Sequence, residues 1–130
     1  MIGGSGIDMR FAIFAGALAM FVSSCASEAS CENELRGRWP SPDGKAAVVA
    51  FMRNCGATVG DNYQVSIVSG TETPSGAGNA LVVDQVPSYS DNLTPIWNGS
   101  SSVTVPIPTG SRVFMRNDNV DGVRVIFEQL

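Results

Sequence analysis

Apolar positions in this chain fall into one long block near the N-terminus and a series of short runs after it. The block, residues 11–22, is apolar over twelve consecutive positions. No later stretch repeats apolar residues at the three- and four-residue spacing of an amphipathic helix. The later runs are separated by segments rich in Gly, Pro, Ser and Asn, which favour turns. The pattern therefore predicts strands joined by turns.

Two of the runs indicate how strands are placed in a sheet. Residues 46–52 (AAVVAFM) are apolar at every position, which is typical of a central strand. Residues 63–68 (YQVSIV) alternate, so Gln64 and Ser66 face away from the more apolar side. The remaining strands are expected at residues 80–86, 96–97, 102–107, 112–116 and 120–127.

Turn residues separate these runs. Residues 41–45 (SPDGK) combine Pro, Asp and Gly, and Asn98-Gly99 is a strong hairpin signal. Pro106 and Pro108 place the run before them at the edge or the end of a sheet. We therefore predict an all-β fold, an antiparallel meander of about six or seven short strands. It forms a sandwich, a small barrel or a single sheet like a propeller blade.

The N-terminal block has the properties of a signal-peptide core. Twelve residues are too few to span a bilayer, which needs about 20. Asp8 is unusual before such a core, whereas a start at Met9 gives a short positive segment that contains Arg10. We expect residues 1–24 to be a signal peptide, with translation starting at Met9.

The residues after this core, Val22-Ser23-Ser24-Cys25, resemble the lipobox of bacterial lipoproteins. The resemblance implies cleavage before Cys25 and acylation at that residue, and the acyl chains would anchor the protein to a membrane. Ala26 follows the cysteine, which by the same resemblance implies an outer membrane, with the domain facing the periplasm. The alternatives are a plainly secreted protein with an ordinary Cys25, and an uncleaved membrane anchor.

The assignment of Cys25 as an acylated residue determines how the rest of the chain is divided. Residues 25–30 are then a lipidated tether, and residues 31–130 form a single β-rich domain. Cys31 and Cys55 remain as an even pair in an oxidising compartment, which favours a disulfide. The bond would close a loop of about 25 residues and stabilise the domain by about 3 kcal/mol. The alternatives are two buried thiols or a metal site, for which two cysteines without histidine are poor ligands.

Composition removes several kinds of chemistry. Histidine is absent, which excludes Ser-His-Asp catalysis, Cys-His catalysis and histidine metal sites. The net charge is −4, with no cluster of Lys and Arg, so we expect no nucleic-acid partner. Asp43, Asp61 and Asp84 remain as candidates for carboxylate catalysis, but no paired acid and base stand out. We predict no enzyme activity and no cofactor.

Residues 117–128 match part of the spacing of a calcium-binding loop. Asn117 stands where the first aspartate is expected, and Arg124 occupies a position that is usually apolar. Residues 123–127 alternate as a strand. We therefore predict a hairpin turn at residues 117–122 and no metal site.

Three motifs resemble a family of small uncharacterised bacterial exported proteins. They are SPDGK at residues 41–45, RNCGAT at 53–58 and QVSI at 64–67. The resemblance covers most of the domain and implies its shape but no activity. Residues 55–58 are either a functional loop or, as we prefer, a disulfide anchor with a tight turn.

SPDGK, an apolar strand and the later Trp97-Asn98-Gly99 also look like one repeat of a TolB-type β-propeller. A propeller needs several blades, and this chain has one copy of the motif. The function of that family is therefore not carried over.

Tyr89 and Trp97 are the candidate partner-binding residues, because both lie beside turns with little regular apolar company. The alternative is that both fold back onto the core. We expect a lipid-tethered binding or accessory module of the cell envelope. An inhibitor of an envelope-targeting enzyme such as lysozyme is the alternative, since an acidic domain suits a basic enzyme.

Overall fold

A computed structural model describes residues 30–56, 60–84 and 87–130. Residues 31–130 form one compact unit, and the described ranges contain nine strands and no helix. In these ranges no segment could cross a membrane as an apolar helix. The predicted signal peptide, the start at Met9, the acylated Cys25 and the first residues of the tether lie outside the described residues. So do Ala57 and Thr58 of the CGAT motif.

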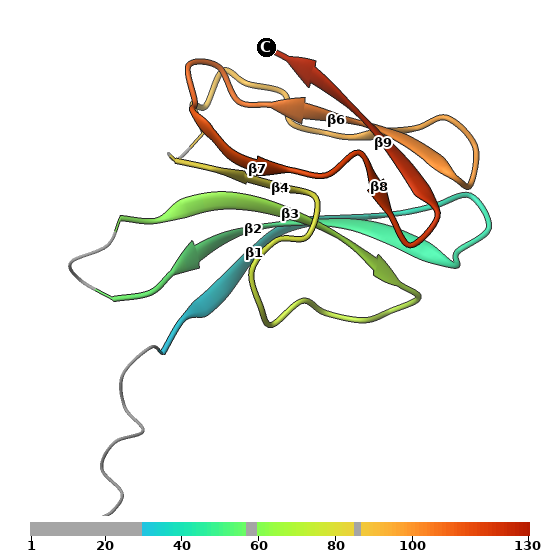
Figure 1. Ribbon diagram of the computed structural model, residues 1–130, viewed down its shortest axis with the longest axis horizontal. Coiled ribbons are helices and arrows are strands. Elements are labelled where there is room, and N and C mark those ends of the chain that lie inside the picture. The colour runs from blue at the N-terminus through green and yellow to red at the C-terminus, as the bar shows by residue number, and fades with distance from the viewer. Residues whose placement is uncertain (1–29, 57–59, 85–86) are drawn as a thin grey trace, which may run out of the picture. The chain divides into compact units, whose positions relative to one another are not determined.

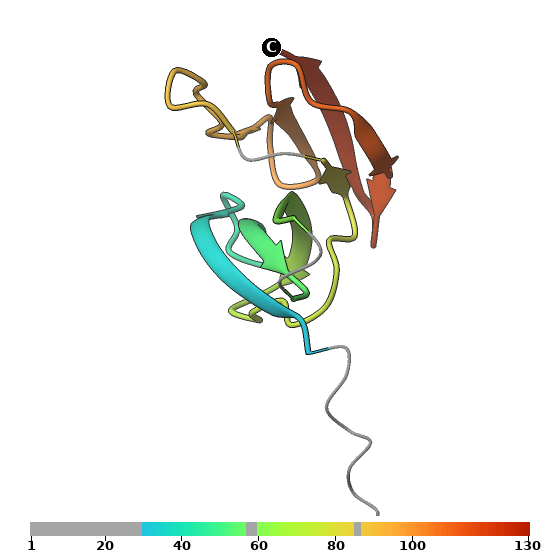
Figure 2. The same ribbon diagram turned by 90° about the vertical axis from the view of Figure 1, so that its left-hand side faces the viewer.

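The strands form two sheets, which Figures 1 and 2 show stacked as two layers. Sheet A contains, in spatial order, β1 (Glu32–Pro40), β2 (Ala46–Asn54), β3 (Asn62–Ser69), β4 (Leu81–Val83) and β7 (Val113–Arg116). Sheet B contains, in spatial order, β5 (Ile96–Trp97), β6 (Ser102–Ile107), β9 (Val123–Gln129) and β8 (Asn119–Val120).

The predicted all-β class is confirmed, and the two packed sheets make the arrangement a sandwich. The pairing is not antiparallel throughout, because β6 and β9 run parallel over six residue pairs. After β5 and β6 in sheet B, the chain returns to sheet A at β7, so the path is not a simple meander. Pro106 lies beyond the end of β5, which pairs only with Val103 and Thr104, so β6 is locally an edge there as expected.

Strand β2 is central and buried on both faces, as its sequence predicts. Its inner face packs against sheet B, and Phe51 on its outer face is completely buried. The inner core joins residues from both sheets, with Val48, Val65, Leu81 and Val83 from sheet A and Val103, Val105, Ile107 and Val125 from sheet B. The outer face of sheet A carries a second apolar cluster of Ala47, Val49, Phe51 and Val68.

A segment of irregular chain holds the outer face of sheet A through buried polar groups. The predicted alternation of β3 is correct, but Gln64 and Ser66 are both buried rather than exposed. The amide N–H of Gly78 donates to Gln64 Oε1 at 2.7 Å, and that of Asn79 donates to Ser66 Oγ at 3.2 Å. A Cβ on Gly78 would lie 2.8 Å from the carbonyl oxygen of Leu81, so the close approach requires glycine.

Residues 69–79, which lead from β3 to β4, are hydrogen-bonded to the sheet at several points. Arg38 on β1 donates to the carbonyls of Gly70 and Glu72. Asn33, also on β1, donates to the carbonyls of Pro74 and Gly76 at 3.0 and 2.9 Å. The polar side chains of β1 therefore fix this segment, and backbone carbonyls that would otherwise need water find protein donors.

The three predicted turn motifs form as expected. Asn98-Gly99 lies in the connection between the antiparallel strands β5 and β6, and the amide of Asn98 donates to the carbonyl of Ser102 at 2.8 Å. In SPDGK, Asp43 accepts hydrogen bonds from the amide of Lys45 and the hydroxyl of Ser41, which lower the pKa of its carboxyl, and Gly44 has a φ of 72°. Residues 117–122 form the predicted hairpin turn, with positive φ at both Asp121 and Gly122, as a type I′ turn requires.

Strand β1 was not among the predicted strands because its sequence, ENELRGRWP, is mostly polar or charged and has no regular apolar alternation. It pairs with β2 along its whole length, with a bulge between Leu35 and Gly37. The predicted disulfide joins Cys31 to Cys55, directly beyond the last pair of this ladder. The bond therefore fastens the outermost strand of sheet A to its centre.

Candidate functional site

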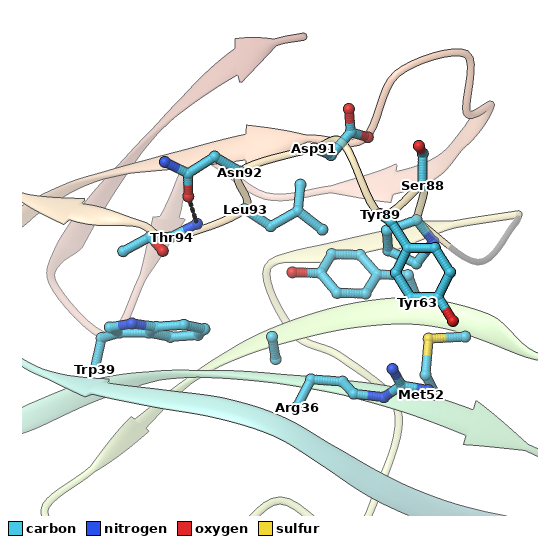
Figure 3. A pocket seen from close by; sticks show the side chains of 12 residues that line it. Arg36, Trp39, Met52, Tyr63, Ser88, Tyr89, Asp91, Asn92, Leu93 and Thr94 are labelled. Atoms are coloured by element: carbon cyan, nitrogen blue, oxygen red, sulfur yellow. Dashed lines mark hydrogen bonds between the residues drawn. The ribbon is translucent and has the colours of Figure 1, made fainter.

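A cavity of about 600 Å³ lies between the inner face of sheet A and the segment of residues 87–94 (Figure 3). Strands β1, β2 and β3 form its floor. An irregular segment, rather than a strand, forms its roof, so the space at this end is not filled by a second layer of strand side chains. We call the cavity the aromatic groove and define it by Arg36, Trp39, Met52, Tyr63, Tyr89 and Leu93.

The roof is fastened away from the floor by Asp91. Its carboxylate accepts hydrogen bonds from the amide and the hydroxyl of Thr109, at 2.9 and 2.8 Å. Asn92 Oδ1 accepts a bond from the amide of Thr94 at 3.1 Å. Leu93, between these two residues, contributes an apolar wall to the groove (Figure 3). The hydrogen bonds that hold the roof in place are therefore made to residues that do not belong to the floor, and the space between roof and floor stays open.

Trp39 is held on the floor by its neighbours. A Cβ on Gly37 would lie 2.3 Å from Cη2 of Trp39, so the indole lies directly over this glycine. The indole N–H of Trp97 donates to the carbonyl oxygen of Trp39 at 2.9 Å. Gly37 and Trp97 together fix the position of Trp39.

Tyr63 supplies the most unusual polar group of the groove. The residue is 3 % exposed, and its hydroxyl points into the cavity (Figure 3). Among the residues that the structure describes, none forms a hydrogen bond with this hydroxyl. Burial raises the pKa of Tyr63 from 10.0 to about 12, against an opposing effect of Arg36. The group therefore stays protonated at neutral pH and can donate a hydrogen bond to a bound oxygen.

The two predicted partner-binding residues have different environments. Tyr89 is fully exposed and stands at the mouth of the groove. Trp97 is partly buried, packs against the inner core and supports Trp39 from outside the groove. Only Tyr89 lines the groove and has the free aromatic surface that contact with a partner needs.

The main floor residues of the groove were not among the predicted site residues. Trp39 and Arg36 lie on β1, which was not recognised as a strand, and Tyr63 was recognised only as an inward-facing strand residue. The sequence Gly37-Arg38-Trp39 is a signal in retrospect, because glycine makes room for an aromatic ring two positions away.

A second cavity of about 500 Å³ continues from the groove across Met52, which lines both. Its walls include Glu32, Glu34 and Asp61, and we call it the acidic end. Glu34 lies 3.7 Å from Arg36, with both side chains well exposed, so this pair contributes little to stability.

The three carboxylates considered for catalysis serve different parts of the fold. Asp43 caps its turn, Asp61 accepts a bond from Asn54, and Asp84 accepts one from the amide of Arg112. No three acidic or cysteine side chains within the described ranges are arranged to hold a metal ion.

No protein-family model, no curated protein and no solved structure matches this chain. The resemblance to exported proteins with the SPDGK, RNCGAT and QVSI motifs stays a prediction.

Alanine substitutions of Tyr89 and Trp97 should show which of the two is a surface residue and which is packed against the core. Tyr89→Ala removes an exposed ring and should leave the melting temperature within a few degrees of wild type. Trp97→Ala removes a packed indole and its hydrogen bond, and should lower the free energy of unfolding by about 3 kcal/mol. Urea unfolding followed by circular dichroism measures both. A large loss for Tyr89→Ala, or none for Trp97→Ala, would contradict these placements.

The raised pKa of Tyr63 predicts a specific loss of stability at high pH. The folded protein holds the phenol proton more tightly than the unfolded chain. The contribution of this phenol to the free energy of unfolding is therefore complete below pH 10 and is lost as the pH rises towards 12. Absorbance at 295 nm should show a tyrosinate step near pH 12 that Tyr63→Phe lacks. A step near pH 10 that disappears in this variant would show that the phenol is not buried.

Proposed function

We propose that this protein is a lipid-tethered binding module of the cell envelope, which captures a partner in the aromatic groove. One observation carries the proposal: Tyr63 presents to an open groove of about 600 Å³ a hydroxyl that no described residue hydrogen-bonds. A donor left unpaired beneath a bound ligand costs about 1–3 kcal/mol, so the hydroxyl favours a ligand that places an acceptor against it. A mostly apolar cavity with a few convergent polar groups is the usual form of a binding site.

Two further features support the cell envelope as the location. The Cys31–Cys55 disulfide fits an oxidising compartment outside the cytoplasm. The lipobox-like sequence before Cys25 fits an acyl anchor in the outer membrane, with the domain facing the periplasm. The module needs no catalytic group, which agrees with the structural roles of Asp43, Asp61 and Asp84.

Photo-crosslinking in living cells tests this function. A benzoyl-phenylalanine at position 89 should give a discrete adduct on illumination, because its ring stands at the mouth of the groove. The adduct should be in the membrane fraction and should carry label when the cells are fed alkyne palmitate. Cys25→Ser should abolish the label.

Phe114 provides the matched control, since it is 54 % exposed and lies on β7, away from the groove residues. The same crosslinker at position 114 should give no such adduct. Equal adducts at both positions, or none at position 89, would contradict the binding site, and unchanged labelling of Cys25→Ser would contradict the anchor.

A further inference from the structure

We propose that the occupant of the groove is an extended peptide segment of another protein, with a large apolar side chain close to a lysine or arginine. This inference rests on the proposed function and specifies the chemistry of the partner. Three independent features of the site carry it: an apolar half, an acidic half and an unpaired strand edge.

The apolar half of the site is formed by the aromatic groove. Trp39, Met52 and Leu93 surround the space, and the exposed ring of Tyr89 can close over what enters (Figure 3). Aromatic and thioether side chains of this kind suit a large apolar side chain. The Tyr63 hydroxyl, which has no acceptor among the described residues, can donate to a peptide carbonyl on the same segment.

The acidic half of the site is the reason for expecting a lysine or arginine in the partner peptide. Glu32, Glu34 and Asp61 line the second cavity, which shares Met52 with the groove. The bond that Asp61 accepts comes from the neutral side-chain amide of Asn54, so this contact does not compensate the charge of Asp61. The weak contact of Glu34 with Arg36 leaves that carboxylate able to meet another cation. Charge complementarity thus favours a segment with a lysine or arginine next to its apolar residue.

The edge of sheet A favours a peptide over a glycan. Strand β1 pairs with β2 on one side and, within the described part of the chain, with no strand on the other. Its outer backbone groups can add an extended segment as a further strand. In the roof, the bonds to Thr109 and Thr94 already use one acceptor position on each oxygen of Asp91 and on Asn92 Oδ1, which leaves fewer positions for sugar hydroxyls.

Selection from a phage-displayed library of random dodecapeptides on the full-length protein in mild detergent tests the inference. Enriched peptides should place an aromatic or large aliphatic residue within about three positions of Lys or Arg, the reach of neighbouring side chains on an extended chain. Binding of a synthesised, fluorescently labelled winner is then measured by anisotropy. The double variant Glu32→Gln, Glu34→Gln should weaken it at least tenfold.

Two further variants complete the test. Tyr63→Phe, which removes only the hydroxyl, should weaken binding about fivefold, and Glu128→Gln on β9 should change nothing. Because Glu32 and Glu34 are exposed, their amide variants should fold normally, so the test stands even where Tyr63→Phe is unstable.

Several results would overturn the peptide assignment. They are no enriched peptides, enrichment of acidic peptides, equal binding by the Glu32 and Glu34 double variant, or binding to a glycan array alone. The crosslink at position 89 distinguishes this failure from that of the proposed function. If the crosslink persists, the groove binds a partner of another class, and if it is also absent, both proposals fail.

Discussion

The burial of both faces of β2 and β3 is the constraint on which the rest of the structure depends. A strand pair that is buried on both sides needs two covers, and the described residues form only one other sheet. Sheet B covers the inner face. The outer face is held by residues 69–79, whose backbone satisfies the buried polar groups of Gln64 and Ser66. Polar side chains in the core therefore act as attachment points for this irregular cover.

The groove forms because the inner face of sheet A is covered partly by sheet B and partly by an irregular segment. At the β1 side, residues 87–94 lie over the sheet and are fastened through Asp91 to Thr109 rather than to the floor. The indole of Trp39 fills part of the space over Gly37, and none of the described residues hydrogen-bonds the hydroxyl of Tyr63 there. The disulfide keeps β1, which carries the floor and the acidic end, attached to the centre of the sheet.

The sequence alone could predict the features that depend on neighbouring residues. The apolar run of β2 and the turns at Gly44 and Gly122 are local. The pairing of Cys31 with Cys55 was expected because the lipobox resemblance assigns Cys25, the third cysteine, to acylation. Strand β1 could not be predicted, because its charged side chains bond a segment more than 30 residues away. The parallel pairing of β6 with β9 is likewise set by long-range packing.

Dependence on long-range contacts also explains why the candidate site was only partly predicted from the sequence. Tyr89 and Trp97 have similar turn-rich surroundings in sequence. Long-range contacts separate them, because Trp97 packs against the core and bonds Trp39, 58 residues away, whereas Tyr89 is exposed. Native-state hydrogen exchange tests the central claim that residues 69–79 are a structural layer. The amides of Gly78 and Asn79 should be protected to within about 2 kcal/mol of those in β2, with the exposed Gly76 exchanging much faster. Exchange of Gly78 and Asn79 at the rate of an open loop, while β2 stays protected, would contradict it.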